Sequence, residues 1–192
     1  MSPVTHFLVS WLIAESTVDG RRARVLVTAA GIAPDIDGLG ILADVATTGT
    51  TDDARYWSEY HHVLGHNVWL CLLVMGLCAT FSQGRRLRCA LAAALAFHTH
   101  LLMDLFGSRG PDGYNWPIPY LAPFWVRPEF SWRGQWALNA WPNFAITIVA
   151  VGATLYVAWR HGHSALEFFS SKWDSVLVAV LRSRFGVAPD AD

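Results

Sequence analysis

The chain has 192 residues and a net charge of −1, and its mean hydropathy is +0.30. Hydrophobic residues make up 53% of it and charged residues only 15%, whereas a soluble domain carries about 25% charged residues. This composition excludes a disordered chain and a strongly basic nucleic-acid-binding protein. It favours a membrane protein over a very apolar soluble helical protein.

The first part of the chain predicts a helical hairpin followed by a polar connection. Apolar stretches at 4–14 and 25–33 are separated by a basic turn, and each is too short to cross a membrane alone. Pro34 ends the second stretch. Residues 38–60 are rich in Gly, Thr and Asp, so a polar connection is expected there.

Three later segments approach the length of a membrane span, which is about 20 helical residues and as few as 17. They are 67–83, 89–106 and the end of 135–159. No strand-like alternation competes with them. We therefore expect an all-α, membrane-embedded helical bundle over residues 1–163, followed by an amphipathic surface helix and a short acidic tail over 164–192.

Basic residues divide between the two ends of these helices. Ten of them gather at one set of ends: Arg21, Arg22, Arg24, Arg85, Arg86, Arg88, Arg160, Lys172, Arg182 and Arg184. Because cytoplasmic ends of membrane helices are enriched in Lys and Arg, these ends and the C-terminus are expected in the cytoplasm.

Histidine and aspartate gather at the opposite ends. The residues are His6, Asp35, Asp37, His61, His62, His66, His98, His100 and Asp104. His100 and Asp104 are one helical turn apart, so their side chains share a face and can reach one cation. Helical spacing pairs His62 with His66 in the same way, whereas His61 would have to lie at the helix entry. Ionisable residues within an apolar helix are costly and mark function by default.

Imidazole and carboxylate ligands without thiolate predict zinc, with manganese or iron as alternatives. One zinc takes three or four ligands, and this chain offers more. We therefore expect two or more divalent ions. Paired ions of this kind are typical of phosphoester hydrolysis by a metal-activated water.

Ordered motifs resemble those of the bacterial membrane-bound metal-dependent hydrolases, a LexA-regulated, inner-membrane-associated family. The motifs are Thr5-His6, Pro34-Asp35-Ile36-Asp37, His61 and His66 five residues apart, His100 and Asp104, and Asn115-Trp116-Pro117. The family's middle motif reads His-Arg-Gly-x-Thr-His-Ser, where this chain has His61-His62-Val63-Leu64-Gly65-His66-Asn67. The family is in turn similar to zinc-dependent phospholipase C and to single-strand nucleases.

The resemblance implies a metal-ligand set and roles for its neighbours. The implied ligands are His6, Asp35, Asp37, His61, His66, His100 and Asp104. Asp35 or Asp37 would orient the attacking water or take its proton. Independently of the resemblance, polar or aromatic residues near these ligands are candidates for supporting them or contacting the substrate: His62, His98, Arg109, Asn115 and Trp116.

The sequence thus predicts an enzyme of the inner membrane, with its site on the extracytoplasmic side. Expected partners are membrane lipids and a small-molecule or lipid phosphoester substrate. No nucleic acid is expected, although the similarity to nucleases leaves a nuclease-like activity open. The same residues would also suit a metal-binding or transport protein without hydrolysis, or a scaffold with a degenerate site.

Overall fold

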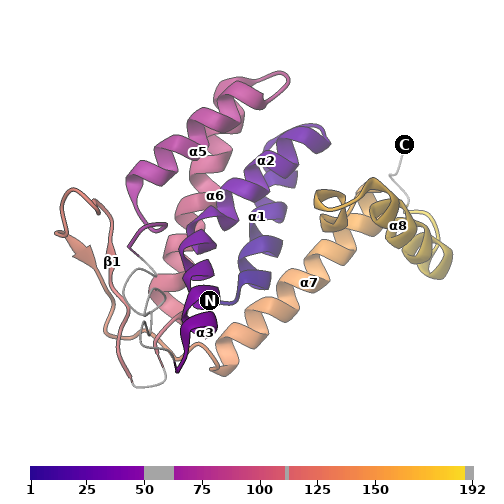
Figure 1. The fold of residues 1–192 in the computed structure, drawn as a ribbon. Coiled ribbons are helices and arrows are strands. Elements are labelled where there is room, and N and C mark those ends of the chain that lie inside the picture. Colours follow the sequence, from indigo (N-terminus) through magenta and orange to yellow (C-terminus); the bar gives the residue numbers. More distant parts are fainter. Residues whose placement is uncertain (50–62, 111–112, 189–192) are drawn as a thin grey trace.

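The computed structural model describes residues 1–49, 63–110 and 113–188 of the chain. Five helices run side by side through the bundle (Figure 1): α1 (Pro3–Thr17), α2 (Arg21–Ile32), α5 (Val68–Phe81), α6 (Arg86–Gly107) and α7 (Trp141–His161). Helix α6 is central, because it packs against α1, α2 and α5. The expected all-α fold is confirmed.

Helices α1 and α2 form the predicted hairpin. The Ser2 side chain accepts a hydrogen bond from the Thr5 amide, and Pro3 occupies the first helical position, where its missing N–H is not needed. Val18 ends α1 in an extended conformation, and Gly20 turns the chain with a φ of 83°. The basic turn between the helices therefore lies at the end away from the N-terminus.

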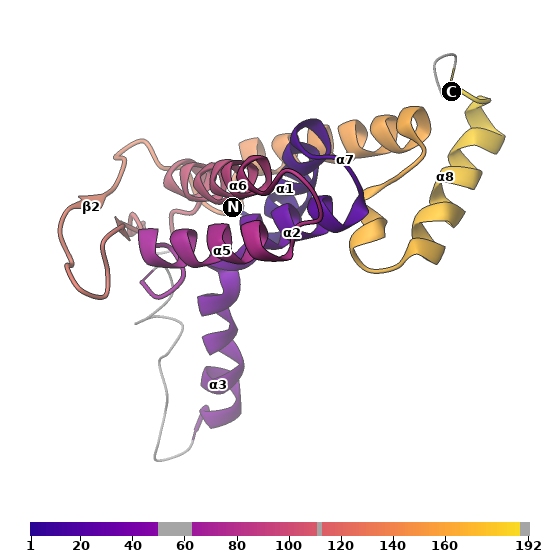
Figure 2. The ribbon, with the colours of Figure 1, turned by 90° about the horizontal axis from the view of Figure 1, so that it is seen from above.

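The polar connection expected from residue 38 begins later than predicted. A 3-10 helix, η1 (Ala33–Leu39), has Pro34 in its first turn, and α3 (Gly40–Thr47) follows it without a loop. Helix α3 buries no residue and projects from the bundle (Figure 2), exposing Ile41, Leu42 and Val45. The helical spacing of these apolar residues favours a helix more strongly than the nearby Gly and Thr favour a loop.

Three helical stretches are long and apolar enough to cross a membrane: Arg21–Thr47, Arg86–Gly107 and Trp141–His161. The second and third of these contain the segments expected at 89–106 and at the end of 135–159, which are therefore confirmed as helices of sufficient length and apolarity. The expected span at 67–83 falls short, because Asn67 caps α5 at its start and Ser82 leaves the helix after 14 residues. Arg21–Thr47 qualifies instead, because η1 joins α2 to α3.

A strand pair and two helical elements complete the described chain. The loop between α6 and α7 contains a short antiparallel pair, β1 (Ile118–Pro119) with β2 (Glu129–Phe130). After α7, a 3-10 helix, η2 (Ala165–Phe168), leads into α8 (Ser171–Phe185). Helix α8 buries only Val178 and lies beside the bundle (Figure 2).

Close packing of α1, α2 and α6 depends on Gly31. A Cβ at this position would lie 2.1 Å from the Ser10 hydroxyl and 3.0 Å from the Ala96 Cβ. We expect Gly31→Ala to lower the free energy of unfolding by about 1–3 kcal/mol through overpacking. Thermal unfolding in detergent measures this loss of stability. The control is Gly76→Ala in α5, where a Cβ meets nothing within 4 Å. Because alanine has the higher helix propensity, no loss of stability is expected for this variant. Equal melting temperatures for the two variants would contradict the prediction.

Candidate metal centre

Asp104 is the residue on which the polar cluster converges. It lies in the second half of α6 and is 2% exposed. Its Oδ1 is 3.0 Å from His6 Nε2, and its Oδ2 is 3.2 Å from both His66 Nε2 and His100 Nε2. The amino group of Met1 also contacts Oδ1. Three imidazoles from separate parts of the sequence therefore surround one carboxylate.

The orientation of His100 favours a cation beside it. In the neutral ring, Nδ1–H donates to the Gly31 carbonyl at 2.8 Å, which leaves a lone pair on Nε2. That nitrogen faces Asp104 Oδ2 at 3.2 Å and Asp35 Oδ1 at 3.6 Å. Three acceptor atoms pointing at one another repel, and a bound cation would remove the repulsion. The carbonyl that fixes the tautomer is the partner expected behind a metal-binding histidine.

Four ligand atoms lie close enough together to bind one ion. One atom each from His6, Asp35, His100 and Asp104 lie within 4.8 Å of one another. Within the described part of the chain, His6 Nδ1, Asp35 Oδ2 and His100 Nε2 are buried without a hydrogen-bond partner. Two imidazoles and two carboxylates form a ligand set that zinc accepts. The residues present therefore fit the metal that the sequence predicted.

Asp37 and His66 extend the cluster toward α5. Asp37 Oδ2 accepts a hydrogen bond from the Gly65 amide at 2.8 Å and lies 3.2 Å from His66 Nδ1. A Cβ on Gly65 would lie 2.0 Å from the Pro34 carbonyl oxygen, so this close approach needs glycine. Burial alone would lower the pKa of His66, but its hydrogen bonds to Asp104 and Asp37 raise it to about 9.

Of the nine His and Asp residues that the sequence singled out, the structure brings six together: His6, Asp35, Asp37, His66, His100 and Asp104. His61 and His62 lie outside the described residues. His98 does not join the cluster, because its side chain is exposed and contacts the Tyr120 hydroxyl at 2.7 Å and the Ala94 carbonyl at 2.8 Å. Periodicity explains this outcome, since residues two positions apart, such as His98 and His100, are separated by about 200° around a helix.

The three loop residues predicted to assist the site are held by contacts outside the group of four ligands. The Arg109 amide donates to the Trp136 carbonyl at 3.1 Å. Asn115 Nδ2 donates to the Trp132 carbonyl at 3.4 Å. The Trp116 amide donates to Gln135 Oε1 at 3.0 Å. These contacts order the loop that follows α6.

Two buried amides that the sequence did not single out hold the last turn of α6. Gln135 Nε2 donates to the Asp104 carbonyl at 3.0 Å, and Asn143 Nδ2 donates to the Gly107 carbonyl at 2.8 Å. A helix end leaves such carbonyls without helical partners, and these side chains satisfy them. The signal that could have found them is their polarity at the start of the otherwise apolar segment 135–159.

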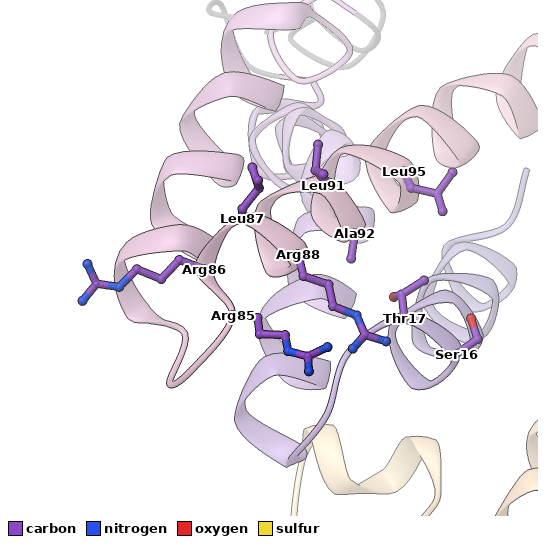
Figure 3. A pocket seen from close by; sticks show the side chains of 9 residues that line it. All are labelled: Ser16, Thr17, Arg85, Arg86, Leu87, Arg88, Leu91, Ala92 and Leu95. Carbon is purple, nitrogen blue, oxygen red and sulfur yellow. The ribbon is translucent and has the colours of Figure 1, made fainter.

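The opposite end of the bundle is basic. Figure 3 shows Arg85 and Arg88 directed toward the end of α1, whereas Arg86 points away from it. A cavity of about 690 Å³ lies there, bordered by Ser16 and Thr17 of α1 and by these arginines of α6. The arginine residues and the His/Asp cluster therefore lie at opposite ends of the helical bundle, as the sequence predicted.

The fold and the cluster define an all-helical membrane protein with a buried His/Asp site near one end of its bundle. The family model of the YdjM inner membrane protein matches residues 1–182, and the chain belongs to this family. No curated protein and no solved structure matches the chain. The family's description gives a location in the inner membrane and no activity, so it supports the membrane part of the expected resemblance but not hydrolase or phospholipase C similarity.

The pKa of His66 predicts how the metal-free protein responds to pH. Because this pKa is higher in the folded chain than its ordinary value of 6.5, the stabilisation is fully present below pH 6.5 and is lost as pH rises through about 9. We expect chelator-treated protein to lose a few kcal/mol of unfolding free energy between pH 6 and pH 10. Denaturant titration at each pH measures the loss.

Two variants separate His66 from other groups that titrate over this range. His66→Gln should flatten the pH profile, because glutamine carries no charge to lose. His98→Gln should leave the profile unchanged, because His98 lies outside the cluster. A profile that is identical in the wild type and in His66→Gln would show that His66 does not carry the effect.

Proposed function

We propose that this protein is a membrane-bound, metal-dependent hydrolase that cleaves a phosphoester in a lipid or a lipid headgroup. The observation that carries the proposal is the position of Asp35. Its Oδ1 faces His100 within the cluster, and the residue also lines a neighbouring apolar cavity. The candidate metal centre and the apolar cavity thus share the Asp35 carboxylate.

The shape and lining of this apolar cavity suit an acyl chain. Its volume is about 670 Å³, and its apolar lining comes from the start of α1, the end of α2 with η1, and the segment after α7. It extends from Asp35 to the aromatic side chains of Phe7, Phe168 and Phe169, whose rings pack together. A lipid held there would place its headgroup toward Asp35 and its chain along the helices.

His6, Asp35, His100 and Asp104 would hold one divalent ion. A second ion would be bound by one nitrogen of His66 together with the carboxylate on that side of its ring, which is Asp37 at Nδ1 and Asp104 at Nε2. Such ions lower the pKa of a water molecule and stabilise charge on phosphoryl oxygens. The Asp35 side chain is 22% exposed, and its Oδ2 has no hydrogen-bond partner among the described residues. This buried oxygen could accept the proton of a water bound beside it as that water attacks phosphorus, and Asp35 could then return the proton to the departing ester oxygen.

The core between the two ends supports hydrolysis over transport. A transporter needs a polar path through the bundle. Between the His/Asp cluster and the arginine end lie Ala14, Val27, Ala93 and Phe97, all 0% exposed. These apolar residues separate the polar cluster from the arginine end. Transport and a non-hydrolytic metal site remain outcomes that the experiments below distinguish.

The distribution of charge supports an orientation in the membrane. Arginine-rich turns favour the cytoplasmic side, and Arg21, Arg24, Arg85 and Arg88 lie at the end of the bundle opposite Asp104. We therefore place the cluster on the extracytoplasmic side and the C-terminus in the cytoplasm.

Replacing Asp104 with Asn tests the metal centre. The variant keeps the shape of the side chain but removes the charge shared by three imidazoles. We expect the cluster of the purified wild type to bind two zinc ions, and Asp104→Asn to lose most of this cluster-bound metal and at least about 100-fold of phosphoesterase activity toward phospholipids. Elemental analysis and phosphate-ester release measure the two effects.

His98→Gln is the matched control for that experiment, because it removes an imidazole of α6 that faces away from the cluster. It should retain metal and activity. Asp104→Asn protein with wild-type metal content and raised stability would instead indicate an ordinary buried carboxylate. Metal binding without release of any phosphoester product would favour a non-hydrolytic metal site.

Reporter fusions test the orientation. A reporter fused after Asp192 should be active in the cytoplasm, and one inserted at Gly49, just after α3, should be active outside it. Paired reporters, one active only in the cytoplasm and one only outside it, measure both positions. The same side for both positions would contradict the proposed topology.

A further inference from the structure

A second group of metal-binding side chains lies at the arginine end of the bundle. Glu15 is near the end of α1, and His161 and His163 are at the end of α7. Glu15 Oε1 is 2.7 Å from His161 Nδ1 and 3.3 Å from His163 Nε2. Three ligand atoms from these residues lie within 4.8 Å of one another. Helices distant in sequence therefore meet through one carboxylate and two imidazoles.

The backbone between the two histidines brings them onto the same carboxylate. Gly162 ends α7 in the left-handed conformation, with a φ of 75°, and its amide closes the helix on the Ala158 carbonyl. Residues in this conformation reverse the direction of the chain. As a result His161, on the last turn, and His163, beyond it, both reach Glu15, with ring centroids 6.1 Å apart.

His163 is held in place without a hydrogen bond at its ligand atom. Its ring packs edge-on against Trp11, with centroids 6.1 Å apart, and Trp11 is fixed by a hydrogen bond to Glu167 at 3.0 Å. His163 Nε2 is buried and has no hydrogen-bond partner in the part of the chain that the structure describes. A buried, oriented imidazole nitrogen beside a carboxylate is what a metal ligand requires.

We propose that Glu15, His161 and His163 bind a divalent transition-metal ion, with zinc the best match. Two histidines and one glutamate form a known zinc ligand set, which leaves a fourth position for water. His161 is 43% exposed on its side chain, so that position faces solvent and the ion can exchange. The C-terminal ends of α1 and α7 also carry partial negative charge that favours a cation. The bound ion links α7 to α1.

Zinc binding to the tag-free, full-length protein in detergent tests this site. The background is Asp104→Asn, which separates the new site from the cluster on α6. We expect this background protein to bind about one equivalent of zinc and its melting temperature to rise with zinc concentration. Adding His161→Gln and His163→Gln should abolish both effects. Calorimetric titration and thermal unfolding measure them.

His98→Gln in the same background is the control, and it should leave zinc binding unchanged. Because His161 is exposed, His161→Gln alone serves as a variant that keeps the fold, and about a ten-fold loss of zinc affinity is expected for it. Unchanged zinc affinity in both histidine variants would overturn the proposal. Loss of zinc from these variants would support it even if Asp104→Asn retained all its metal, so this result does not depend on the proposed hydrolase.

Discussion

A buried carboxylate in an apolar helix is the constraint on which this structure depends. An unpaired charge at the depth of Asp104 costs several kcal/mol, so the fold must surround it with compensating groups. It does so by bringing His6 from α1 and His66 from the start of α5 to the side chain on α6. At this end of the bundle, α1 and the segment before α5 therefore meet α6 through polar side chains as well as through apolar packing.

Much of the fold could be read from the sequence, because apolar length and helical spacing are local properties. The i, i+4 relation placed His100 and Asp104 on one face, and the arginine turns separated the two ends of the bundle. Helix α3 was missed because its Gly- and Thr-rich surroundings resemble a loop. The length of α5 was overestimated because the capping role of Asn67 depends on backbone geometry.

The candidate site could likewise be predicted only in part from the sequence. His6, Asp35 and Asp37 were expected beside Asp104 because topology gathers helix ends. The supporting amides Gln135 and Asn143 bind backbone carbonyls, and such contacts leave no spacing signal in a sequence. The group at Glu15 also escaped notice, because its two histidines converge only through the reversal at Gly162.

Helix α3 connects the two carboxylates of η1 to a part of the chain that lies outside the bundle. Asp35 and Asp37 lie on η1, and α3 continues from η1 without a loop. Helix α3 buries none of its residues and exposes Ile41, Leu42 and Val45. Because η1 and α3 are continuous, a change in the direction of α3 would also reposition Asp35 and Asp37 within the cluster.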